Sequence, residues 1–255
     1  MLAHVRQAER LAAILEELTT GSVGVSELAT RLDVSAATIR RDLELLEEQR
    51  LLSRTHGGAV RHGVLYELPL RYKSARRHDE KRRIAQAAAS RIPDGVALGL
   101  TGGTTCTEVA RELVDRERLT VVTNALNIAS ELAVRPNLKL VVTGGYARLE
   151  SYELVGPLAE QALAGLNLDV AVIGVDGIDA EAGCTTHHEV EAHTNLALID
   201  RARHVIVVAD SSKIGAVVFA QICPIERVHE LITDRDVDQH ALRALREAGV
   251  RVETV

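Results

Sequence analysis

Residues 25–60 constrain the fold of this chain more than any other stretch. They read VSELATRLDVSAATIRRDLELLEEQRLLSRTHGGAV. The spacing of the apolar residues predicts a short helix over 26–32, a break at 33–34 and a longer helix over about 35–49. Two strand-like segments follow, joined by Gly57-Gly58. This order is typical of a winged helix-turn-helix, the unit that places its second helix in the major groove of DNA.

A further amphipathic helix is expected to precede this unit, over residues 6–18. Leu11, Ile14, Leu15 and Leu18 fall on one stripe of such a helix. The stripe supplies the apolar face that a small helical core needs.

The longer helix has one apolar face, and its opposite face is small and basic. Ile39, Leu43 and Leu46 are spaced to be buried together. Ser35 is expected to cap the helix by accepting from the backbone N–H of Ala37 or Thr38. Arginines on the other face can bind guanine or clamp a phosphate, and the wing can reach phosphates or the minor groove. The predicted DNA-contacting residues are Ser35, Ala36, Ala37, Thr38, Arg40, Arg41, Arg54 and His56.

Charge is distributed unevenly along the chain. The formal net charge is −6, yet residues 50–83 hold 10 Lys and Arg against 3 Asp and Glu. A basic segment beside a helix-turn-helix fits a local DNA footprint. The alternatives are a helical hairpin with a solvated arginine pair and, for residues 71–83, a solvated basic linker.

Composition argues against several other classes of protein. Aromatic residues make up only 2% of the chain, which disfavours the stacking platforms that bind single-stranded nucleic acid or RNA. Cys106, Cys184 and Cys223 lack CxxC spacing, as suits a reducing cytosol. We find no signal peptide and no apolar run near 18 residues, so we expect a cytoplasmic protein without a membrane role.

The remainder of the chain alternates between strand-like and helical segments. Residues 61–79 are polar and basic and contain Pro69, which predicts a linker between a winged helix-turn-helix domain over 1–60 and a second domain over 80–255. A helix is expected over 79–91. Seven short β-branched runs then alternate with helical segments, at 96–100, 119–123, 138–143, 170–174, 205–209, 231–233 and 250–252. This alternation predicts an α/β domain with a mostly parallel sheet covered on both faces.

Polar and glycine residues follow five of these predicted strands. In open α/β sheets, ligands bind beyond the carboxyl ends of the strands. Glycines after the first strand allow close backbone approach, and threonine hydroxyls beside a helix N-terminus can cradle an anion such as phosphate. Lys213 would be the counter-charge for a phosphate, and Asp176 would accept from sugar hydroxyls. The predicted effector-binding residues are Thr101, Gly102, Gly103, Thr104, Thr105, Asn124, Gly144, Gly145, Asp176 and Lys213.

Simpler interpretations of these residues remain open. The glycine-threonine loop also fits an ordinary turn between a strand and a helix. Asp176 also fits a turn residue before glycine, and Lys213 fits a solvated loop lysine.

On these motifs the chain resembles the DeoR family of bacterial transcriptional regulators. The matching stretches are VSELATRLDVSAATIRRDLELLE, RTHGGA, a GTT-type loop, VVTN, TGG, GVDGID, GCTT…EVEA and ADSSK…LITD, which span nearly the whole chain. The resemblance implies an N-terminal winged helix that binds operator DNA, usually as a repressor. It also implies a C-terminal domain that resembles ribose-5-phosphate isomerase in fold and senses a phosphorylated sugar or related metabolite. Binding of that effector would weaken DNA affinity.

One position departs from the family pattern. The family loop commonly begins with Asp, as D-x-G-[ST]-T, whereas this chain has Thr101. The change removes a carboxylate from the expected pocket edge and points to a different effector. The resemblance assigns the phosphate cradle to Gly103, Thr104, Thr105 and Lys213, and the sugar side to Asp176.

Three histidines and two glutamates gather in residues 187–193. His187 and Glu191 share a helical face at i, i+4, but the other two histidines diverge. This is not the HExxH arrangement, so we expect a polar helix start, no metal and no other cofactor. Contact of His187 or Glu189 with the effector is the alternative.

Two functions of different classes fit the sequence. The leading hypothesis is a metabolite-responsive repressor of carbohydrate-metabolism genes that binds double-stranded operator DNA as a homo-oligomer, a dimer or tetramer. Activation in place of repression uses the same fold and stays open.

The alternative is a sugar-phosphate isomerase-like enzyme with an appended DNA-binding domain. Such isomerases show DGADE followed by a KGGG-like segment, whereas here GVDGID is followed by GCTTHHEVEA. Asp176 is retained without the rest, which favours the regulator and predicts no catalytic residue.

Overall fold

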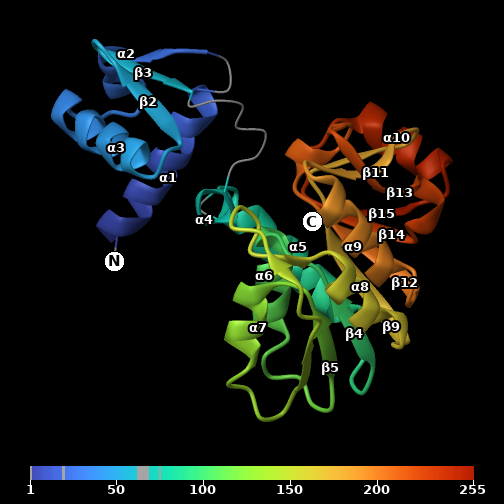
Figure 1. Cartoon of the computed structure of the whole chain (residues 1–255). Coiled ribbons are helices and arrows are strands. Elements are labelled where there is room, and N and C mark those ends of the chain that lie inside the picture. The colour runs from blue at the N-terminus through green and yellow to red at the C-terminus, as the bar shows by residue number, and fades with distance from the viewer. Residues whose placement is uncertain (1, 19–20, 62–68, 75) are drawn as a thin grey trace. The chain divides into compact units, whose positions relative to one another are not determined.

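The computed structural model describes residues 2–18, 21–61, 69–74 and 76–255. The chain divides into two compact units, Met1–Arg76 and Arg77–Val255 (Figure 1). Of the segment 61–79, which the sequence predicts as a linker, residues 62–68 and 75 lie outside the described residues. Its described part holds a short helix, α4 (Leu70–Lys73). The predicted domain boundaries at residues 60 and 80 stay a prediction.

The N-terminal unit has the element order of a winged helix-turn-helix. Before α4, its elements are α1 (Leu2–Glu17), β1 (Val23–Gly24), α2 (Val25–Arg31), α3 (Ala36–Glu48), β2 (Leu52–Thr55) and β3 (Gly58–Arg61). The strands form an antiparallel sheet in the order β1-β3-β2. The predicted fold of this region is therefore confirmed. Helix α1 begins before the expected start at residue 6, because no glycine or proline interrupts the residues that precede it.

The apolar stripes predicted for the helices form the core of this unit. The buried residues from those stripes are Leu11, Ile14, Leu15, Leu18, Ile39, Leu43 and Leu46. The wing packs tightly against β1, since a side chain at Gly58 would overlap the carbonyl oxygen of Val23. Residues His56 and Gly57 make the turn of the wing, and Gly57 adopts a positive φ of 96°.

A buried ion pair fixes α3 against α1. Asp42 is 1% exposed, and its carboxylate accepts hydrogen bonds from Nε of Arg10 at 2.5 Å and from Nη2 of Arg10 at 3.1 Å. The hydrogen bond to Asp42 raises the pKa of Arg10 further above its usual value. The pair joins the helix that carries the predicted DNA contacts to the first helix of the unit.

Replacing Arg10 with methionine is expected to destabilise the N-terminal unit by about 3–5 kcal/mol, because Asp42 is then buried without its cation. Urea unfolding of the full chain, followed by circular dichroism, measures the shift of that unit's transition. Arg31→Met is the matched control: Arg31 pairs at the surface with Glu17 and Glu27, and its loss should move the transition little. Coincident transitions for Arg10→Met and wild type would contradict the role of the pair.

The C-terminal unit is built on a seven-stranded parallel sheet. The strand order is β15-β14-β12-β9-β4-β5-β6, and each neighbouring pair is parallel. The strands are β4 (Ala97–Leu100), β5 (Thr120–Thr123), β6 (Lys139–Val142), β9 (Leu168–Gly174), β12 (Ala202–Val208), β14 (Glu230–Thr233) and β15 (Arg251–Thr254). These match the seven β-branched runs, so the predicted α/β class with a mostly parallel sheet is confirmed.

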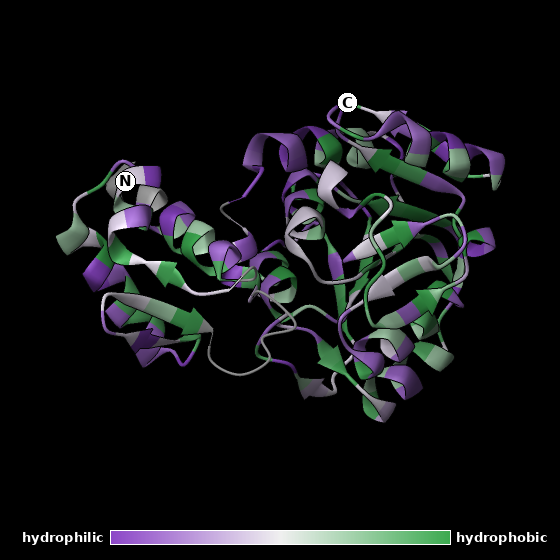
Figure 2. Ribbon diagram, turned by 90° about the horizontal axis from the view of Figure 1, so that it is seen from above, coloured by the Kyte–Doolittle hydropathy of each residue, from purple (hydrophilic) through white to green (hydrophobic). Residues whose placement is uncertain are grey.

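Helices cover both faces of this sheet. One face packs against α5 (His78–Ser90), α6 (Thr104–Glu112) and α7 (Leu126–Leu132), and the other against α8 (Pro157–Ala164), α9 (Glu189–Ile199) and α10 (Gln239–Glu247). Alternate residues of β9 enter the two cores: Val170 and Val172 join the first, and Ala171 and Ile173 the second. Figure 2 shows the apolar colour concentrated on the strands, while the helices carry both colours.

Two small antiparallel sheets, which the sequence did not predict, accompany the large one. The first pairs β7 (Tyr146–Ala147) with β8 (Leu154–Val155), and the second has the order β10 (Gly177–Asp179), β11 (Gly183–Thr186), β13 (Ala220–Cys223). Short 3₁₀ turns, η1 (Ser211–Lys213) and η2 (Ile225–Arg227), lie between the remaining elements. The strands of both small sheets follow the carboxyl ends of β6, β9 and β12, so they bring further side chains to that end of the large sheet.

None of the helices within the described ranges is both long and apolar enough to cross a membrane.

Candidate DNA interface and effector site

The start of α3 has the geometry that the sequence predicts for a DNA-reading helix. Ser35 is its N-cap, with φ −69° and ψ 150°, and the serine hydroxyl accepts from the backbone N–H of Thr38 at 3.1 Å. Ala37, Arg40 and Arg41 are exposed, and Ala36 and Thr38 are half-buried. The predicted cap is therefore confirmed, and the predicted contact residues lie on one accessible part of the helix.

Arg40 and Arg41 are available for an external anion. Within the described residues, neither guanidinium has an ion-pair partner, whereas Asp42 beside them is buried against Arg10. The unpaired arginines thus stand on a helix whose orientation a buried contact fixes. Contact of these residues with DNA stays a prediction.

The wing is attached to the far end of the same helix. The backbone N–H of Arg54 in β2 donates to Oε1 of Glu47 in α3 at 2.9 Å. Arg54 and His56 are exposed. The predicted wing contacts are therefore held in a fixed relation to α3.

In the C-terminal unit, the glycine-threonine loop lies between the end of β4 and the start of α6. Gly103 is the N-cap of α6 with φ 105°, and no side chain caps this helix. Among the residues that the structure describes, no side chain caps the backbone N–H groups of this first turn, and an anion is a suitable partner for them. Thr104 is half-buried and Thr105 is buried in that turn.

Thr101 has an internal role in this loop. Its side chain is 0% exposed, and its hydroxyl accepts from the backbone N–H of Gly174 at 3.0 Å. The contact ties the end of β4 to the end of β9. The structure thus buries Thr101, and its contact with an effector stays a prediction.

A polar network joins the ends of β9 and β12. Nζ of Lys213 lies 3.4 Å from Oδ1 of Asp176, and the Thr186 hydroxyl donates to Oδ2 of Asp176 at 3.3 Å. The same hydroxyl lies 2.7 Å from Oε1 of Glu191, whose other oxygen pairs with Nη1 of Arg148 at 2.5 Å. The two residues singled out from the sequence, Asp176 and Lys213, therefore come together.

A second set of contacts joins the ends of β4 and β5. Nδ2 of Asn124 donates to the carboxylate of Glu153 at 3.2 Å and to Oδ1 of Asn195 at 3.2 Å. Glu153 is 4% exposed and fills the space that a side chain at Gly102 would occupy. Oδ1 of Asn124 is buried and has no hydrogen-bond partner among the described residues.

Five residues of these networks were not predicted as site residues: Arg148, Glu153, Thr186, Glu191 and Asn195. Thr186 and Glu191 belong to the GCTT…EVEA motif, which could have indicated them. Arg148 and Glu153 lie around β7 and β8, and no pattern in the sequence marks them.

Gly144 and Gly145 lie one strand further along, after β6. Both have positive φ angles, 71° and 125°, and a side chain at Gly145 would come within 2.8 Å of the Val155 carbonyl oxygen. They shape the β7–β8 segment, and their contact with an effector stays a prediction.

The histidine-rich stretch forms the start of α9, as expected. His188 is the N-cap, and its Nδ1 accepts from the backbone N–H of Val190 at 3.3 Å. Among the residues that the structure describes, no three His, Cys, Asp or Glu side chains come together as metal ligands do. Burial raises the pKa of Cys106, at the start of α6, to about 12, so its thiol stays protonated at neutral pH.

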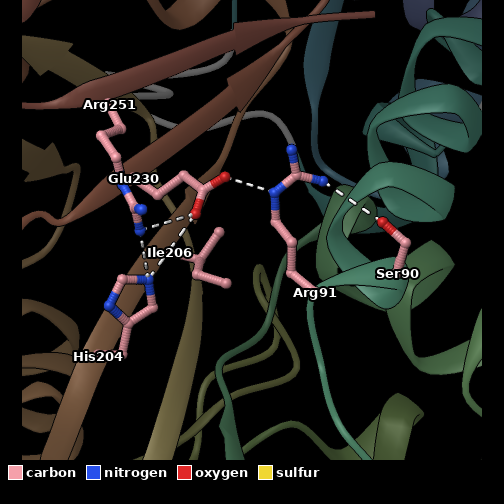
Figure 3. Close-up of a pocket in the computed structure, with 6 residues that line it drawn as sticks. All are labelled: Ser90, Arg91, His204, Ile206, Glu230 and Arg251. Carbon is pink, nitrogen blue, oxygen red and sulfur yellow. Dashed lines mark hydrogen bonds and ion pairs between the residues drawn. The ribbon is translucent and has the colours of Figure 1, made fainter.

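A separate cavity of about 580 Å³ lies near the amino ends of β12, β14 and β15. Figure 3 shows its charged side chains pointing toward one another. Glu230 pairs with Arg91, with Nη2 of Arg251 at 3.4 Å and with Nε2 of His204 at 3.7 Å. Since ligands of open α/β sheets bind at the carboxyl ends of the strands, the candidate effector site is the cluster around Asp176 and Lys213.

Comparisons with known proteins cover both units. The DeoR-like helix-turn-helix domain matches residues 10–62, and the DeoR C terminal sensor domain matches residues 76–235. The glycerol-3-phosphate regulon repressor of Escherichia coli (strain K12) is 32% identical, with 98% of this chain and 99% of that protein covered. The transcriptional repressor GlcR of Bacillus subtilis (strain 168) is 35% identical, with 96% and 95% covered.

Solved structures of ribose 5-phosphate isomerase also match. The enzyme from Methanocaldococcus jannaschii is 19% identical with a TM-score of 0.37, and the match covers 53% of this chain and 54% of that chain. A likeness at this level carries no argument about activity.

Proposed function

The chain belongs to the DeoR family of transcriptional regulators, with a DNA-binding helix-turn-helix domain and a sensor domain, and on that premise we propose what it regulates and how. It represses genes of carbohydrate metabolism and leaves operator DNA when a phosphorylated sugar or related metabolite binds the sensor domain. Its full-length relatives are regulators and not enzymes, which favours this function over a sugar-phosphate isomerase.

The arrangement at three neighbouring strand ends carries the effector part of this proposal. Strands β12, β9 and β4 are adjacent in the sheet, and they are followed by Lys213, by Asp176 and by the uncapped start of α6. Lysine and a helix N-terminus together suit a phosphate, and a carboxylate suits hydroxyl groups. A phosphorylated polyol supplies both. The relative named for glycerol 3-phosphate supports this ligand class.

The DNA part rests on α3. The capped helix start, together with exposed Arg40 and Arg41, supports major-groove binding. A single such helix reads a half-site, so we propose a homodimer or homotetramer that presents paired helices roughly 34–36 Å apart. We also propose that the protein acts in the cytoplasm, where operator DNA and phosphorylated sugars occur together.

Binding of the protein to the DNA upstream of its own gene tests the proposal. Fluorescence anisotropy would measure operator affinity alone and with glycerol 3-phosphate, ribose 5-phosphate, glucose 6-phosphate and galactosamine 6-phosphate. We expect one of them to weaken binding by about 5–150-fold, the usual range of allosteric coupling. Specific binding that none of the four releases would contradict the proposed effector class. Absence of specific binding at moderate salt would contradict the operator assignment.

A further inference from the structure

Two consecutive arginines occupy the boundary between the units. Arg76 is the last residue of the N-terminal unit, and its guanidinium pairs with Glu16 of α1. Arg77 is the first residue of the C-terminal unit, and its Nη1 donates to the hydroxyl of Ser211 at 2.8 Å. Neighbouring residues of the chain are therefore anchored to different units.

The anchor of Arg77 lies in the turn that carries the predicted phosphate ligand. Ser211 and Lys213 are the first and last residues of η1. Asp234, which is 0% exposed, accepts from the backbone N–H of Ser211 at 2.6 Å. A displacement of Lys213 toward a bound anion would therefore act on the residue that Arg77 holds.

Charge reinforces this anchor. The guanidinium of Arg77 lies 3.9 Å from Asp210 and 4.0 Å from Asp234, both of which are buried. In the ranges that the structure describes, no other basic side chain forms an ion pair with either carboxylate. Arg77 is thus the cation shared by Asp210, which follows β12, and Asp234, which follows β14.

The backbone of Arg77 also adopts an uncommon conformation. Its φ of 50° and ψ of 43° lie in the left-handed region, which residues with a side chain rarely adopt. It is the N-cap of α5, and its carbonyl oxygen accepts from the backbone N–H of Lys81 at 3.0 Å. The side-chain anchor and the uncommon backbone conformation therefore occur at the same residue.

We propose that Arg77 is the positioning residue that couples effector binding to the DNA-binding unit. In the ligand-free protein, the anchor on Ser211, Asp210 and Asp234 holds Arg77 at the start of α5, directly after Arg76 in the chain. An effector phosphate that draws Lys213 displaces η1 and releases Arg77, and the change reaches α1 through Arg76 and Glu16. This mechanism deepens the proposed function and rests on it.

The test compares Arg77→Met with Arg82→Met in the full chain. Arg82 is exposed on α5, so its loss removes the same charge without touching the anchor. Operator affinity is measured with and without the sugar phosphate from the panel above that releases the wild type, and calorimetry measures binding of that same compound. We expect Arg77→Met to bind the compound, yet to show less than about a twofold effect of it on operator affinity, against about 5–150-fold for Arg82→Met.

Two results of this comparison would overturn the proposal. One is an Arg77→Met protein that the compound releases as it releases the wild type. The other is loss of compound binding in Arg77→Met, which would make Arg77 part of the ligand site. If the wild type itself does not bind operator or respond to any compound, the proposed function has failed, and this failure is distinct from that of Arg77.

Amide hydrogen exchange of the ligand-free proteins tests, without any effector, whether the Arg77 anchor is coupled to α1. Arg77→Met is expected to speed amide exchange both around η1 and in α1, whereas Arg82→Met should leave both unchanged. Faster exchange confined to the C-terminal unit would overturn the proposal, because the anchor would then be only a local structural contact.

Discussion

Arg40→Ala is expected to weaken operator binding by about 5–150-fold, the equivalent of about 1–3 kcal/mol for one arginine that binds a guanine through both of its donors. Arg40 is exposed near the start of α3, and its guanidinium has no ion-pair partner among the described residues. Its loss should therefore remove the predicted contact to DNA, and it breaks no ion pair among the described residues. Fluorescence anisotropy with operator DNA at several salt concentrations measures the effect.

The salt series separates two roles for the neighbouring arginines. A variant that loses a phosphate contact binds all sequences less well and lowers the slope of log K against log salt by about 1. A variant that loses a base contact relaxes sequence preference with less change in slope. Arg243→Ala is the control. Arg243 is exposed in the C-terminal unit, and its substitution removes the same charge. Equal effects of Arg40→Ala, Arg41→Ala and Arg243→Ala would show that α3 does not contact DNA.

Lys213→Met is expected to raise the dissociation constant of the effector by about 10–150-fold, because a hydrogen bond to a charged group contributes about 1.5–3 kcal/mol. Operator binding without effector should be retained, since Lys213 lies in the sensor domain and pairs with Asp176. Calorimetry with the releasing sugar phosphate measures the loss directly. Release of the operator would then need a correspondingly higher concentration of the same compound.

A matched variant controls for the charge. Lys139 is exposed on β6, and Lys139→Met should bind the effector as the wild type does. Asp176→Asn tests the other half of the pair and should weaken binding through lost contacts to hydroxyl groups. Wild-type affinity in Lys213→Met would place the phosphate elsewhere than at the end of β12.

The elements of the fold that the sequence predicted well are those whose pattern is local. The seven strands of the large sheet are short, mostly apolar runs separated by helical segments, and the runs of the five inner strands are largely buried, so the local sequence identifies the strands. Ser35 as a helix cap is equally local, because donor and acceptor are three residues apart.

The features that the sequence missed depend on contacts between distant segments. Strands β7 and β8 are each two residues long and form by pairing with each other. No local sequence pattern therefore predicts them. Glu153 becomes a site residue because it lies against Gly102 and Asn124. Thr101 was predicted at a pocket edge, but its hydroxyl serves the backbone of Gly174, 73 residues away in the chain.

The packing of Glu153 against Gly102 limits how this sensor can acquire a new ligand. A side chain at position 102 would collide with the buried carboxylate of Glu153. A substitution at position 102 therefore has to be accompanied by one at position 153. Grafting the common D-x-G-[ST]-T loop with any residue but glycine at its second position would require a shorter side chain at 153 in the same step. Either substitution alone is expected to impair the response to the effector. The two substitutions together are expected to restore it, so their effects would be non-additive.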